Sequence, residues 1–173
     1  AGGARGRGPA APGRARRLLL ITAWRLVAPR WATGAFDGEG ARLSGGRWNP
    51  KGVPVVYLAS SLALAALELL IHIDYSRALA QHVAIPVTFD ETLVLRVRSS
   101  DLPASWPDIG SVPETQALGA VWVREAGSAL LAVPSAVVPH EVNYLLNPRH
   151  PQAGEVQIGS PEPFHYDPRL LKR

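Results

Sequence analysis

The feature that constrains this chain most is an almost wholly apolar segment from residue 62 to residue 73. It contains only alanine, leucine and isoleucine apart from one glutamate and one histidine, and it follows two serines at 60–61, either of which can cap a helix. A helix that is apolar on nearly all sides belongs in a protein core. Helical spacing places Leu64, Glu68 and Ile71 on one face, so we expect Glu68 to lie close to buried surface.

A carboxylate in that position needs a partner. Glutamate is rarely buried alone, because an isolated charge in an apolar environment is strongly disfavoured. Glu68 is therefore expected to face a cation or a ligand rich in hydroxyl groups. Two structural alternatives stay open at this point: the helix edge is wet, or Glu68 pairs with an arginine only to support the fold.

A glycine-rich turn precedes this helix, with the sequence GGRWNPKG at residues 45–52. Glycine lets the backbone approach a ligand closely. Arg47 offers a planar fork suited to phosphate or carboxylate, and Trp48 offers a surface for stacking or packing. The turn matches neither a phosphate loop nor a dinucleotide fingerprint. From composition alone it is either an anion-binding turn or an ordinary loop.

Metal, disulfide and membrane sites are not indicated. The chain has 173 residues and no cysteine, which excludes disulfides and thiolate metal ligands and suits a reducing cytoplasm. His140-Glu141 begins like a zinc-protease motif, but residue 144 is tyrosine, so the second histidine ligand is missing. No apolar run reaches the roughly 18 to 20 residues that a membrane helix requires.

The net charge of +4 comes from one end of the chain. Residues 1–17 contain five arginines and no acidic residue, which leaves the rest of the chain close to neutral. Such a segment has too few large apolar residues to fold. We expect 1–17 to be a disordered basic tail, either simply solvated or in nonspecific contact with nucleic acid or an acidic partner, and 18–173 to be one domain.

The remaining pattern predicts an α+β fold in which a compact mixed β core carries flanking helices. The expected helices are 62–73 and one from 114 or 115 to about 126, ended by Gly127. Segments 31–43 and 101–113 are expected to be loops. Expected strands are rich in β-branched residues and occupy 18–27, 53–58, 82–87 and 93–97. In the last third of the chain, short strands joined by structured loops are expected in 129–138, 156–158 and 164–166.

An ordered series of motifs resembles the RES domain. The series runs WRL at 24–26, GGRWN at 45–49, VYLA at 56–59, A-x-x-E-x-x-x-H at 65–72, VPSAVVP at 133–139 and NYLLNPRHP at 143–151. RES domains are toxins of bacterial toxin–antitoxin pairs, with a core like that of ADP-ribosyltransferases and an activity that consumes NAD+. The resemblance therefore implies an enzyme that cleaves the bond between nicotinamide and ribose in NAD+, as a glycohydrolase or a phosphorylase, without a metal.

The resemblance also assigns residues to the site. The arginine, glutamate and serine of the family name correspond to Arg25, Glu68 and Ser135, and Arg47 and Tyr57 match further site positions. Arg25 and Arg47 would hold the diphosphate, Tyr57 would pack on nicotinamide or ribose, and Glu68 would act on the ribose. Ser135 lies between a proline and an alanine, unlike an elbow nucleophile, so we expect it to bind substrate or orient Glu68 and not to attack.

The same resemblance implies partners and a location. An NAD-consuming enzyme would injure its own cell, which implies an Xre-like helix-turn-helix antitoxin in the bacterial cytoplasm, with DNA bound only through that antitoxin. A homodimer within a larger toxin–antitoxin complex is compatible with this. Two other functions remain open from the sequence: a protein ADP-ribosyltransferase that uses NAD+, and a noncatalytic module that binds nucleotide or nucleic acid.

Overall fold

The computed structural model describes residues 19–74, 76, 78, 80–108 and 112–171. These residues form the expected α+β fold around one mixed sheet, in the order β4-β5-β6-β2-β1-β3-β7, with β8 also paired to β3. The β4–β5 pair is parallel and the other pairs are antiparallel. The strands are β1 Leu20–Val27, β2 Val56–Ala59, β3 His82–Asp90, β4 Val94–Arg96, β5 Leu130–Pro134, β6 Val142–Leu146, β7 Gln157–Ile158 and β8 Glu162–Phe164.

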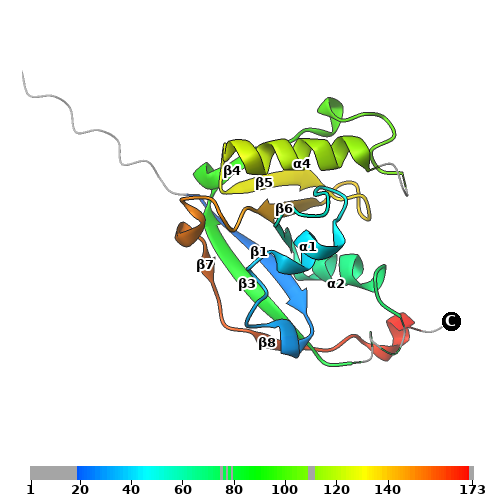
Figure 1. The fold of residues 1–173 in the computed structure, drawn as a ribbon. Helices are drawn as coiled ribbons and strands as arrows, with labels where there is room; N and C mark the ends of the chain where they lie inside the picture. Colours follow the sequence, from blue (N-terminus) through cyan, green and yellow to red (C-terminus); the bar gives the residue numbers. More distant parts are fainter. Residues whose placement is uncertain (1–18, 75, 77, 79, 109–111, 172–173) are drawn as a thin grey trace, which may run out of the picture.

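The sheet divides into two halves between β1 and β2. β1 pairs with β3 along its whole length, from Leu20 opposite Asp90 to Val27 opposite Val83. It meets β2 at one position, Trp24 opposite Ala59. Figure 1 shows the consequence, because β1 and β3 cross the direction of β5 and β6 at a steep angle. The two halves therefore part beside Trp24, next to Arg25.

Helices cover the sheet on both sides of this division. α4 (Pro113–Glu125) lies along β5 in Figure 1. Its Trp122 belongs to a buried cluster with residues of the glycine-rich turn and of β5 and β6. α2 (Leu62–Leu70) packs against β1 and β2, and α1 (Glu39–Ser44) precedes the glycine-rich turn. The α4 cluster contains Trp48, Val55, Trp106, Trp122, Leu131, Val133 and Leu145.

α2 confirms the expected capped helix but is only half buried. The Ser61 hydroxyl accepts a hydrogen bond from the Leu64 amide at 3.1 Å, as an N-cap should. Leu64 is 1% exposed and packs against β1 and β2, whereas Leu67 is 44% and Ile71 60% exposed. The expectation of an all-round core helix reaching residue 73 was therefore wrong: the helix ends at Leu70, and its apolar composition continues onto the outer face.

Other local expectations also needed correction. The loop expected at 31–43 contains α1, which Gly38 precedes with a φ of 75°. α4 ends with Ala126 in the left-handed conformation at φ 47°, one residue before the glycine expected to stop it. The first strand of the expected pair at 82–97 extends to Asp90. β6 was not predicted as a separate strand, although it lies at the centre of the sheet.

The expected tail at 1–17 lies outside the described residues, and its boundary with the folded domain stays a prediction. Among the residues that the structure describes, no helix has both the length and the apolar character needed to cross a membrane.

Candidate active site

The Glu68 carboxylate is held by two side chains from the neighbouring strands. Its Oε1 accepts a hydrogen bond of 2.7 Å from the Ser135 hydroxyl and one of 2.6 Å from the Asn143 amide nitrogen. Ser135 follows the end of β5, Asn143 lies at the start of β6, and Glu68 lies on α2 after β2. The site therefore forms where these three segments meet at one end of the sheet.

Every hydrogen-bonding position of the Ser135 hydroxyl is used within the protein. Its side chain is completely buried, and its oxygen accepts hydrogen bonds from the amides of Val137 at 3.1 Å and Val138 at 3.0 Å. A hydroxyl has one hydrogen to donate and two acceptor positions. Because the hydrogen goes to Glu68 and both acceptor positions are used, the geometry favours orientation of Glu68 over nucleophilic attack.

Asn143 is a hydrogen-bond partner of Glu68 that our reasoning from the sequence missed. It was included only as part of a family motif. On β6 it lies opposite Ala59 of β2 on one side and Val133 of β5 on the other. One signal could have pointed to it: an asparagine beginning an apolar run, because a polar side chain beside a buried strand needs a partner.

Arg25 lies where β1 and β2 part, and its guanidinium connects the two sides. Nε donates to the Ala35 carbonyl at 2.9 Å, and Nη1 donates to the Tyr57 carbonyl at 2.8 Å. Burial lowers the pKa of Arg25 to about 10, and the nearby Asp37 carboxylate partly opposes that shift. Arg25 therefore remains a cation at neutral pH, held at the division of the sheet.

Tyr57 lies between the other predicted residues. Its hydroxyl donates to Oδ1 of Asn49 at 2.8 Å and accepts from the Trp48 amide at 3.1 Å. Burial raises the pKa of Tyr57 to about 12; the Trp48 amide and the Arg47 charge lower it, and the Glu68 charge raises it further. Tyr57 is therefore a neutral phenol between the turn with Arg47 and the helix with Glu68.

The turn at 45–52 is built tightly around that phenol. A Cβ atom at Gly46 would lie 2.5 Å from the Tyr57 hydroxyl, so any side chain there would displace the ring. Asn49 is fully buried, and its amide donates to the carbonyls of Ala41 and Val53, both at 2.9 Å. The glycines suggested that the backbone of this turn approaches a ligand closely. In the structure, the backbone at Gly46 closely approaches the Tyr57 side chain instead.

Arg47 and Trp48 face the loop before α4. Nη1 of Arg47 donates to the Trp106 carbonyl at 2.6 Å and to the Asp108 carbonyl at 3.2 Å. Trp48 is 2% exposed, with its ring centroid 6.2 Å from that of Trp106. Trp48 is therefore a core residue, and Arg47 fastens the loop to the turn.

The predicted residues thus form two linked groups. Ser135 contacts Glu68 directly, whereas Arg25 and Arg47 gather around Tyr57. Within the described ranges, neither arginine forms an ion pair with Glu68. The alternative that Glu68 pairs with one of these two arginines only to support the fold is therefore excluded. Those ranges also hold no group of three or more histidine, aspartate or glutamate side chains suited to a metal ion.

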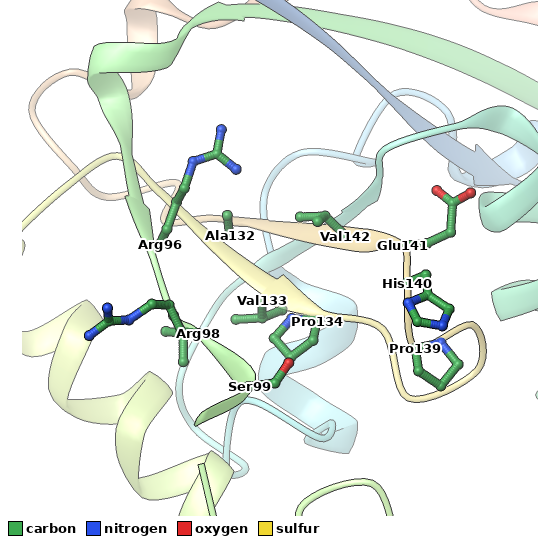
Figure 2. A pocket seen from close by; sticks show the side chains of 11 residues that line it. Arg96, Arg98, Ser99, Ala132, Val133, Pro134, Pro139, His140, Glu141 and Val142 are labelled. Carbon is green, nitrogen blue, oxygen red and sulfur yellow. The ribbon is translucent and has the colours of Figure 1, made fainter. Parts of the chain in front are cut away.

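A hollow of about 340 Å³ is lined by residues 96–99, 132–134 and 139–142, which flank Ser135 in the sequence on both sides. Figure 2 shows Arg96 and Arg98 at one side of it and His140 and Glu141 at the other. The Glu141 carboxylate accepts a hydrogen bond from the Ser60 hydroxyl at 2.9 Å. None of the five predicted site residues lines this hollow.

Comparisons with known proteins agree with the motif series. The RES domain family profile matches residues 22–167. The chain is 37% identical to "Toxin Res" of Yersinia enterocolitica over 149 residues, covering 85% of this chain and 97% of that protein. It is 32% identical to the "Prs ADP-ribosylating toxin" of a Sphingobium species over 160 residues, covering 90% of this chain and 99% of that protein.

A solved structure shares the fold. A chain of the Mycobacterium tuberculosis MbcT–MbcA toxin–antitoxin complex superposes with a TM-score of 0.69 at 20% identity, covering 89% of this chain and 88% of that one. The family match spans both halves of the sheet, including the segments that bear Arg25, Glu68 and Ser135. The chain belongs to the RES domain family and is a homologue of the Res toxins.

Proposed function

We propose that this protein is the toxin of a bacterial toxin–antitoxin pair and that it cleaves the bond between nicotinamide and ribose in NAD+. The observation that carries the proposal is the state of Glu68. Its Oε1 is held by Ser135 and Asn143, while Oε2 has no hydrogen-bond partner among the described residues. Relatives named as toxins, one of them ADP-ribosylating, support an activity of this kind.

The chemistry requires one well-placed negative charge. Nicotinamide is cationic in NAD+, so it leaves with the electron pair of the C1′–N bond and needs no general acid. Positive charge then develops on the ribose, and an oriented carboxylate stabilises it. Oε2 of Glu68 would accept the hydrogen bond of the ribose 2′-hydroxyl. Water or inorganic phosphate then adds at C1′, giving hydrolysis or phosphorolysis.

The other residues would bind the rest of NAD+. The diphosphate is anionic, and an arginine donates charge-assisted hydrogen bonds to such a group. Arg25 keeps its Nη2 for this contact, because the structure assigns its Nε and Nη1 to backbone carbonyls. Arg47 would assist from the turn, and the neutral ring of Tyr57 would pack on nicotinamide or ribose. Ser135 would act through Glu68.

Arg25→Ala is expected to raise the KM for NAD+ by about tenfold or more with a smaller change in kcat, since each hydrogen bond to a charged group is typically worth about 1.5–3 kcal/mol. Steady-state kinetics would measure both constants. Arg124→Ala is the matched control, because that arginine lies 70% exposed on α4. An unchanged KM in folded Arg25→Ala protein would place the diphosphate elsewhere.

We also propose an antitoxin partner with an Xre-like helix-turn-helix module, which would occlude the pocket and provide the DNA contact. The solved neighbour is part of a toxin–antitoxin complex, which supports a partner of this kind. Expression of the chain alone should stop bacterial growth, and co-expression with the partner should restore it and yield a complex on purification. Unimpaired growth with soluble, folded protein would contradict this proposal.

Nicotinamide release from NAD+ by purified, antitoxin-free protein tests the activity. Release that needs inorganic phosphate would indicate phosphorolysis, and release without phosphate would indicate hydrolysis. A protein acceptor is the second candidate, favoured by the relative named as ADP-ribosylating. That reaction would transfer labelled ADP-ribose to a protein, and the label would remain with the protein band after denaturing electrophoresis.

A further inference from the structure

We infer that Asn143 is a positioning residue that selects Oε2 of Glu68 as the oxygen that meets the substrate. The inference rests on the proposed function, because it concerns the same carboxylate. It goes beyond the arginine, glutamate and serine for which the family is named. Asn143 would act through Glu68 and would not itself contact the reacting atoms.

The geometry distinguishes the two oxygens of the carboxylate. The donors Ser135 and Asn143 converge on Oε1, at 2.7 and 2.6 Å. Two donors on one oxygen restrict rotation of the carboxylate about its last bond more than a single donor would. Hydrogen bonds to an ionised group are also shorter and stronger than those between neutral groups. Oε2 is thereby left as the oxygen available for a ribose hydroxyl.

The backbone of Asn143 is held more firmly than a loop could hold it. β6 is an inner strand, paired with β2 at Ala59 and with β5 at Val133. Tyr144, which follows Asn143, is 5% exposed and packs edge to face on Phe89 with the ring centroids 5.2 Å apart. The amide therefore approaches Glu68 from a strand that is fixed on both sides, which suits a residue that must set an angle.

The two donors also come from the same pair of strands. β5 and β6 are antiparallel, with Val133 opposite Asn143 and Pro134 opposite Val142. The Ser135 amide continues this ladder by donating to the Glu141 carbonyl at 3.0 Å. The pairing of the two strands consequently holds Ser135 and Asn143 at a fixed separation. Their two donors are therefore already in place to bind the Glu68 carboxylate on α2.

The test compares Asn143→Ala with Asn147→Ala. Asn147 is the matched control: it is 2% exposed, it lies one residue past β6, and its side chain hydrogen-bonds to the Val123 carbonyl and the Arg149 amide instead of to Glu68. Asn143→Ala is expected to lower kcat of nicotinamide release by about 10- to 100-fold, the usual value of a hydrogen bond to a charged group, with the KM for NAD+ nearly unchanged. Asn147→Ala is expected to lower the melting temperature and leave kcat alone.

A double-mutant cycle separates positioning from simple support of the fold. In a Glu68→Gln background, adding Asn143→Ala should cause no further loss of kcat, because the residue acts through Glu68. A merely structural role would lower kcat by the same factor in both backgrounds and would overturn the inference. If Asn143→Ala does not fold, Asn143→Leu decides, because leucine has a similar volume, lacks the donor that reaches Oε1 of Glu68 and should lose a similar factor of kcat.

The failures of the two proposals have different signatures. Wild-type protein that releases no nicotinamide overturns the proposed function and this inference with it. Active wild-type protein with an unchanged kcat in folded Asn143→Ala overturns the inference alone.

Discussion

Glu68→Gln is expected to lower kcat of nicotinamide release by about two orders of magnitude or more, the usual cost of removing a preorganised charge at a developing cation. The fold should be unaffected. A glutamine oxygen in the place of Oε1 can still accept from Ser135 and Asn143. The amide nitrogen then takes the place of Oε2, so an acceptor becomes a donor and the negative charge is lost where the ribose would need it.

The measurement is kcat beside an NAD+ dissociation constant and a melting curve for each protein. Glu141→Gln is the matched control, because its carboxylate lies near the same strands and contacts Ser60 instead of Glu68's donors. That variant should retain wild-type kcat. Near-normal turnover in folded Glu68→Gln protein that still binds NAD+ would refute the role assigned to this carboxylate.

Gly119→Ala is expected to destabilise the protein by about 3 kcal/mol or more, at or above the upper end of the usual cost of overpacking. Intrinsic helix propensity predicts the opposite sign, a gain of about 0.5–1 kcal/mol for alanine in a helix interior. The structure reverses it because a methyl group at Gly119 would overlap the carbonyl oxygen of Trp48. That oxygen belongs to the backbone, so it cannot move away from the methyl group as the end of a flexible side chain can.

The surrounding contacts make that overlap hard to relieve. On the same helix, the Thr115 hydroxyl donates to the Arg47 carbonyl at 2.6 Å and the Gln116 amide donates to the Gly46 carbonyl at 2.8 Å. α4 therefore clamps the glycine-rich turn at successive residues. Displacing the helix would break these bonds and move the turn that surrounds Tyr57.

Denaturant unfolding measures this effect. Gly40→Ala is the matched control: Gly40 lies in α1, and nothing lies within 4 Å of the position of an added Cβ. We expect that variant to be as stable as the wild type or slightly more stable. A Gly119→Ala protein with wild-type stability would mean that α4 and the turn do not approach each other in this way.

The sequence by itself determined those features that depend on a single helix, strand or loop. The serines before the apolar segment predicted the start of a helix, and the structure confirms Ser61 as its N-cap. Glu68 stood out because one carboxylate among apolar residues requires a partner. The flanking residues of Ser135 argued against a nucleophile, and the contacts of its hydroxyl agree with orientation of Glu68. The motif series identified the family.

Tertiary structure alone decided which residues complete these features. Asn143 meets Glu68 from 75 positions along the chain, Arg25 donates to a carbonyl 32 positions away, and Gly119 excludes a side chain because of the backbone at Trp48. The sequence pattern does not show which residues make these contacts with each other, because helix and strand periodicity describe only the faces of one element. They depend on strand order, register and the division of the sheet beside β1, which are settled only when the whole core packs.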